Sequence, residues 1–167
     1  MKRLLICLLI LTALIGLSCK SAPTKSGAAI DGEVTQEKVN NAFEQIYNTF
    51  RGRLDMTGAE DYTVARGDTL SQITRKYYGN LNDVGLAGAN NGFYFPLIML
   101  ASNDSHIVDP DFIEPGMKLR IPDLKRNLAN ATARKAIKDC LKDVSYVYNK
   151  KGKLAEEEGL LKLSNSL

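Results

Sequence analysis

The chain has 167 residues, with three cysteines, one histidine and no tryptophan. Its formal charge of +3 falls to +1 if Lys2 and Arg3 are removed with a leader, because no acidic residue leaves with them. No basic field then remains to favour nucleic acid, and no zinc, P-loop or dinucleotide spacing is found.

Residues 1–18 are predicted to be a lipoprotein signal peptide. A positive start at Lys2 and Arg3 precedes an apolar stretch, residues 4–17, that is shorter than the about twenty residues needed to cross a bilayer. The following Leu17-Ser18-Cys19 resembles the lipobox of bacterial lipoproteins, which implies acylation of Cys19. Gly16 departs from that pattern, since a large aliphatic residue is usual there. An ordinary signal peptide and an uncleaved anchor are the alternatives.

A tether and an amphipathic helix are expected next. Residues 19–34 are rich in Ser, Ala, Pro, Thr, Lys and Gly, which predicts a flexible linker. Thr35 is a suitable N-cap for a helix over residues 35–56. The apolar stripe of that helix contains Val39, Ala42, Phe43, Ile46, Tyr47, Phe50 and Leu54.

A strand that runs directly into a helix is predicted from residue 61. Tyr62 and Val64 alternate with smaller residues, and Gly67 gives the backbone freedom that a tight turn needs. Thr69 is a good N-cap, and Gln72 three residues later completes a capping box. The buried face of the helix is expected to carry Leu70, Ile73, Thr74 and Tyr77.

A second strand is predicted after Pro115-Gly116, where Met117, Leu119 and Ile121 alternate with charged residues. Together with the first strand and turn, this ending resembles a LysM domain over residues 61–123. The middle of the segment carries the same likeness in Tyr77-Tyr78-Gly79, Phe95-Pro96-Leu97-Ile98 and Asp109-Pro110-Asp111-Phe112-Ile113. The resemblance implies an α+β fold, a βααβ module in which a two-stranded antiparallel sheet packs on two helices.

The resemblance also implies a shallow groove that holds glycans containing N-acetylglucosamine, such as peptidoglycan. Backbone amides and short polar side chains would hold the sugar, while Leu70 and Ile113 pack on its methyl and ring face. The residues carried over by the family motif are Gly67, Asp68, Thr69, Leu70, Asn103, Asp111, Phe112 and Ile113. Residues 80–92 form a longer link than is usual between the two helices, and a surface loop is the favoured interpretation.

Residues 124–167 are expected to be helical, with Gly152 separating two stripes. Cys140 falls on the first stripe, which favours a core position for this thiol. The segment Pro96-Leu97-Ile98-Met99-Leu100-Ala101 is apolar all round, so the flanking helices are expected to pack on Met99 or Leu100. The competing interpretation is an exposed patch that binds a protein partner or a second copy.

These features predict a non-catalytic lipoprotein that faces the periplasm and tethers the envelope to peptidoglycan, without a metal or cofactor. The residue after Cys19 is Lys20, not the aspartate that retains some lipoproteins in the inner membrane at this position. This favours the outer membrane. The single histidine, His106, lies near the expected groove, but a solvated loop position is favoured over ligand contact. Two alternatives stay open: a scaffold whose flanking helices bind a protein, and an ion-sensing LysM protein.

Overall fold

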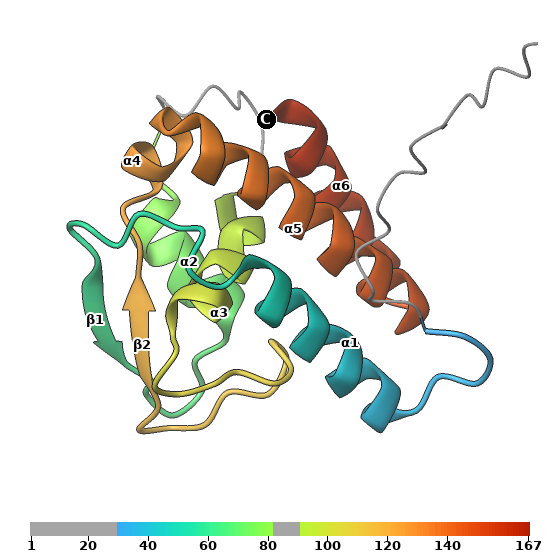
Figure 1. Ribbon diagram of the computed structural model, residues 1–167. Coiled ribbons are helices and arrows are strands. Elements are labelled where there is room, and N and C mark those ends of the chain that lie inside the picture. Colours follow the sequence, from blue (N-terminus) through green and yellow to red (C-terminus); the bar gives the residue numbers. More distant parts are fainter. Residues whose placement is uncertain (1–29, 82–90) are drawn as a thin grey trace, which may run out of the picture.

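The computed structural model describes residues 30–81 and 91–167. Figure 1 shows a two-stranded sheet at one edge of the molecule and a pair of C-terminal helices on the opposite side. The elements in chain order are α1 (Gln36–Phe50), β1 (Glu60–Thr63), α2 (Leu70–Tyr78), the 3-10 turn η1 (Asn91–Tyr94), α3 (Phe95–Ala101), β2 (Lys118–Ile121), α4 (Leu124–Ala129), α5 (Ala131–Lys150) and α6 (Leu154–Ser166).

The sheet confirms the predicted α+β class and the pairing of the two ends of the module. β1 and β2 are antiparallel, with Tyr62 opposite Leu119 and Asp61 opposite Arg120. An ion pair of 2.9 Å joins the Asp61 carboxylate to the Arg120 guanidinium. Leu119 and Ile121 are buried, as the alternation predicts.

Helix α2 begins where the sequence predicts. The Thr69 hydroxyl accepts from the Gln72 amide at 3.3 Å, and the Gln72 side chain accepts from the Thr69 amide at 3.1 Å, so the capping box is complete. The buried face of α2 carries Tyr78 at its end, and Tyr77, which the sequence places on that face, is only half-buried. The Tyr78 hydroxyl donates to the Pro122 carbonyl at 2.7 Å, which ties the end of α2 to the end of β2.

The centre of the molecule is α3, in which every residue is buried. It contacts β2 and α2 within the module, and α1 and α5 outside it. Met99 is 0% exposed and Leu100 is 2% exposed, as expected if the flanking helices cover this helix. The rings of Phe95 and Tyr148 meet edge to face with centroids 5.6 Å apart, joining α3 to α5. The flanks therefore extend the module's core.

The C-terminal segment forms three helices, of which α4 was not predicted separately. The buried Asn127 side chain bonds both the amide and the carbonyl of Asp55 at 2.8 Å, which fastens the link between α1 and β1 to α4. Cys140 is fully buried, as predicted, and burial raises its pKa. A Cβ at Gly159 would lie 2.1 Å from the Phe93 ring, so α6 packs on η1 only because this position lacks a side chain.

The first helix is shorter than the predicted range 35–56. Thr35 caps it as expected, but it ends at Phe50 because Arg51 leaves the helical conformation and Gly52 adopts a φ of +73°. Leu54 consequently lies in the following link, where it is partly buried against the core.

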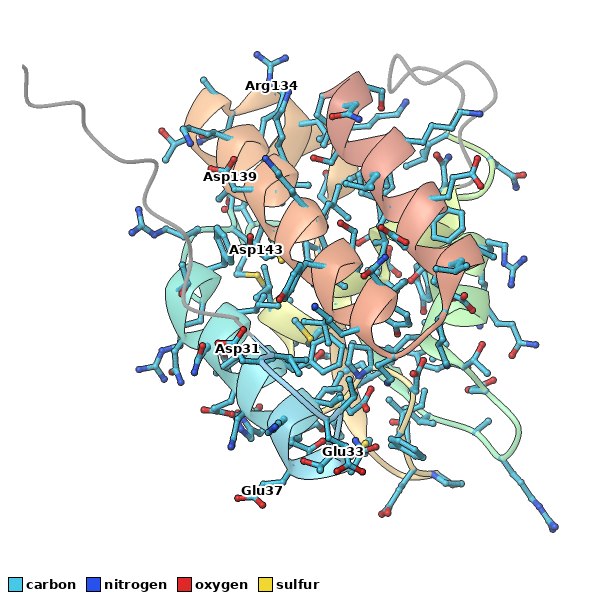
Figure 2. The ribbon with its side chains drawn as sticks, turned by 90° about the vertical axis from the view of Figure 1, so that its right-hand side faces the viewer. Asp31, Glu33, Glu37, Arg134, Asp139 and Asp143 are labelled. Atoms are coloured by element: carbon cyan, nitrogen blue, oxygen red, sulfur yellow. The ribbon has the colours of Figure 1, made fainter. Side chains whose placement is uncertain are left out.

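The leader, Cys19 and most of the tether fall outside the described residues, as does most of the 80–92 link. In the ranges that the structure describes, no helix has both the length and the apolar composition to cross a membrane. Figure 2 shows Asp31, Glu33 and Glu37 around the start of α1, and Arg134, Asp139 and Asp143 at successive positions along α5. These helix surfaces carry charges of both signs, in agreement with the low net charge.

Candidate functional site

The turn between β1 and α2 is built from short-range contacts. Gly67 adopts a φ of +90°, a conformation that a residue with a Cβ rarely takes. The Asp68 carboxylate accepts from the Tyr62 hydroxyl at 2.7 Å and from the Ala65 amide at 2.8 Å. These two hydrogen bonds lower the pKa of Asp68 and so favour its charged form. The same two bonds fix the shape of the turn.

This turn lies beside the end of the loop that joins α3 to β2. The Val64 amide donates to the Met117 carbonyl at 2.9 Å, and the Gly116 amide donates to the Val64 carbonyl at 2.8 Å. The antiparallel pairing thus continues past the strands and closes immediately before the turn. The fold therefore places the start of the first predicted groove loop beside the end of the second.

The apolar residues of the predicted groove differ in accessibility. Leu70 is 2% exposed and belongs to the core, so the expectation that its side chain packs on a sugar is wrong. It is the first residue of α2, and such a position must face inward if the amphipathic helix is to bury its stripe. Ile113 is partly buried against the core, while Phe112 is 65% exposed.

Asn103 and Asp111 form contacts with the flanking helices. The Tyr47 hydroxyl of α1 donates to the Asn103 side-chain oxygen at 2.6 Å. Asp111 bonds side chains at the junction of α5 and α6. Both residues were predicted from the family motif to face the groove, and the contacts that the structure gives their side chains lead to elements outside the module.

An ion-pair network holds the second loop against the α5–α6 junction. The Lys151 side chain is 11% exposed, and its ammonium lies 2.9 Å from a carboxylate oxygen of Asp109, whose side chain is 3% exposed. The same ammonium also pairs with Asp111. Lys153 and the Tyr148 hydroxyl donate to Asp111 at 2.8 Å and 2.9 Å. Burial alone would raise the pKa of Asp111, but these hydrogen bonds outweigh it and lower the pKa.

The network was not predicted from the sequence. Asp109 and Asp111 flank Pro110 in a loop that buries Asp109 and partly buries Asp111, and buried carboxylates require a counter-charge. That requirement was the available signal, but it does not identify which lysine supplies the charge. In the described part of the chain, no group of three or more His, Cys, Asp or Glu side chains is arranged to hold a metal ion.

The comparisons with known proteins identify one family model that matches part of the chain. Residues 62–122 match the model of the LysM domain. A stretch of 67 residues is 40% identical to an uncharacterized protein of Deinococcus radiodurans, covering 40% of this chain and 21% of that protein. The chain thus spans about a fifth of that relative's length. No solved structure matches.

Residues 62–122 are therefore a LysM domain, in the βααβ arrangement that the sequence predicts. LysM is a non-catalytic, carbohydrate-binding domain that generally binds peptidoglycan or other glycans with N-acetylglucosamine.

Proposed function

We propose that this chain binds peptidoglycan through its LysM domain and tethers the wall glycan to a membrane through a lipid on Cys19. The observation that supports glycan binding most strongly is the LysM match over residues 62–122, together with the close approach of its two loops through Val64 and Gly116.

The groove that we propose begins at the turn of residues 65–69. The first amides of a helix lack intrahelical acceptors, and the Thr69 hydroxyl takes that of Gln72, so the Leu70 and Ser71 amides at the start of α2 are the donors suited to hydroxyl and acetamido oxygens. Asp68 is fixed by Tyr62 and Ala65, and Thr69 by its capping box. Ile113 and Phe112 of the second loop supply the apolar contact, and the Leu70 side chain is excluded because it is buried.

Asn103 and Asp111 have a supporting role in this proposal. Their side chains fasten the second loop to α1 and to the α5–α6 junction. A loop held from both sides loses less conformational entropy when it binds a ligand. The flanking helices would thereby contribute to glycan affinity without touching the sugar in the groove.

Binding is tested by sedimentation of the purified full chain, in detergent, with insoluble peptidoglycan. The proposal predicts that the chain sediments with the polymer and that soluble N-acetylglucosamine oligomers compete. A chain that stays in the supernatant at every protein concentration would contradict glycan binding. The scaffold alternative would then gain support.

Membrane attachment requires a separate test. Because Cys19 is the cysteine positioned for lipid transfer, Cys19→Ala is expected to move the protein from the detergent phase to the aqueous phase after phase separation. Cys7→Ala, a change within the leader, is the control and should leave the partitioning unchanged. Equal partitioning of Cys19→Ala and the parent would exclude lipidation as the anchor.

A further inference from the structure

An open depression of about 410 Å³ lies between the start of α1 and the loop that joins α3 to β2. This volume falls within the range of about 300–1,000 Å³ that is usual for small-molecule sites. The family match begins at residue 62, so the α1 wall lies outside it. The residues that line it include Gln36 and Asn40 from α1 and His106, Val108, Phe112 and Met117 from the loop.

We propose that this depression is a second sugar subsite, which takes an N-acetylhexosamine unit of the same glycan chain beyond the unit held in the LysM groove. The inference rests on the proposed function. Phe112 connects the two places, because it lines the depression and directly precedes Ile113 of the groove in the chain. A glycan leaving Ile113 along this loop would pass over Phe112.

The aromatic ring of Phe112 suits the apolar face of a sugar. Phe112 is 65% exposed and Val108 is 38% exposed, so this wall presents two large apolar side chains to solvent. Burial of aromatic surface is favourable, and the C–H face of a pyranose can provide that burial while its hydroxyls stay hydrated. Each of these side chains would lose exposed area on binding without any rearrangement of the core.

The opposite wall offers one acceptor and one donor. A carboxylate accepts only, so the Gln36 amide nitrogen must face Asp109, to which it donates at 2.9 Å. The same nitrogen donates to the Asn40 side-chain oxygen at 2.8 Å. Among the described residues, the Gln36 Oε1 and Asn40 Nδ2 atoms have no further partner. An acetamido group, with one N–H and one C=O, complements this acceptor and donor.

The depression is held rigid from several sides. Asp109, which orients Gln36, is fixed by Lys151 at 2.9 Å. The α1 start is capped by Thr35, and Lys38 donates to the Asp31 and Glu33 carbonyls at 2.8 Å. Preorganised polar groups reduce the entropy lost when a ligand binds.

His106 adds a further constraint on the loop side. It adopts a φ of 34°, which is uncommon outside glycine, and its ring nitrogen lies 2.7 Å from a Glu44 carboxylate oxygen on α1. Non-glycine residues in such conformations concentrate at binding sites, where surrounding contacts maintain them. The loop wall of the depression is thereby attached directly to α1.

The test measures the affinities of the full chain, in detergent, for the trimer and the hexamer of N-acetylglucosamine by calorimetry. The parent should bind the hexamer more tightly than the trimer. Asn40→Ala removes one donor and is expected to weaken hexamer binding about fivefold. Phe112→Ala removes the aromatic wall and is expected to weaken it about tenfold. Asn40→Ala should leave trimer binding unchanged.

Matched controls exist on α1 and on α5, outside the depression. Asn48→Ala removes an exposed asparagine of α1 that bonds Glu44, and Tyr146→Ala removes a 38% exposed aromatic ring of α5. Both should keep the parent's ratio of hexamer to trimer affinity. Asn40→Asp, which keeps the size and the acceptor but removes the donor, should repeat the loss seen with Asn40→Ala.

The outcomes separate the subsite from the groove. Equal affinity of the parent for the two oligomers, or an unchanged ratio of hexamer to trimer affinity in Asn40→Ala, would overturn the subsite while leaving glycan binding intact. A parent that binds neither oligomer nor peptidoglycan would contradict the proposed function, and the subsite with it.

Discussion

Replacing Lys151 with methionine is expected to lower the free energy of unfolding by about 3–5 kcal/mol, because it leaves the buried Asp109 carboxylate without its ion-pair partner. Asp109 is 3% exposed and has Lys151 as its ion-pair partner, so its charge would remain inside the protein. The Lys151 ammonium also lies 5.3 Å from the centroid of the Tyr148 ring and 5.5 Å from that of Phe43. Urea unfolding at neutral pH measures the difference.

The matched control is Lys135→Met, on the exposed side of α5. Lys135 pairs with Asp139 at 2.5 Å, and Figure 2 labels Asp139 on that helix. Because the Lys135 side chain is 77% exposed, its loss should change stability by only about 0–1 kcal/mol. Similar effects of the two substitutions would show that the network at Lys151 contributes little to the folded state.

The same network sets the response of the parent to acid. The folded pKa of Asp111 lies below its unfolded value, so its contribution to stability is complete above the unfolded pKa, about 3.9. The contribution is lost as the pH falls from there through the folded pKa. In Lys151→Met one of the groups that lower this pKa is missing, so the stability deficit relative to the parent should narrow below about pH 4.

Removing the flanking helices is expected to have an equally large effect. A fragment of residues 61–123 should melt tens of degrees below one of residues 35–167. Exposing two large apolar side chains costs about 3–6 kcal/mol, most of the stability of a small domain. Phe95 and Met99 are buried on α3, which contacts α1 and α5. We expect these two side chains to become solvent-exposed when the flanking helices are removed.

Thermal unfolding followed by circular dichroism compares the two fragments, and a third fragment of residues 61–167 separates the contribution of α1. Equal melting temperatures for residues 61–123 and 35–167 would mean that the helices are independent of the LysM domain. The scaffold alternative, in which those helices bind a partner, would then be favoured.

The local parts of the fold could be predicted because their signals lie within a few residues of one another. The Thr69 and Gln72 capping box, the turn at Gly67 and the alternation through Leu119 and Ile121 each depend on short-range geometry. The fully apolar helix at residues 95–101 likewise required cover on all sides, and the flanking helices supply it. In these segments propensity and tertiary packing agree.

The candidate site was predicted less completely because its contacts join distant parts of the chain. Lys151 lies 42 residues from Asp109, and Tyr47 lies 56 residues from Asn103. A motif states which residue types recur at a turn, but it does not state which side chains are used by neighbouring helices. For the same reason the motif could not show that the Leu70 side chain is buried in the core.

The central claim is that the turn of residues 65–69 binds peptidoglycan, and sedimentation of Gly67→Val with the insoluble polymer tests it most directly. Ile113→Asp is less suitable, since Ile113 is partly buried against the core and a charge there would also destabilise the fold. At Gly67 nothing lies within 4 Å of an added Cβ, so the change acts through the backbone and the surface of the turn.

Gly52→Val is the matched control, because Gly52 has a φ of +73°, equally open surroundings and a place in the α1–β1 link. Each substitution should cost about 1–2 kcal/mol of stability through the left-handed backbone. We expect Gly52→Val to sediment with peptidoglycan as the parent does, and Gly67→Val to remain in the supernatant. Equal sedimentation of a folded Gly67→Val protein would contradict the claim that this turn binds the glycan.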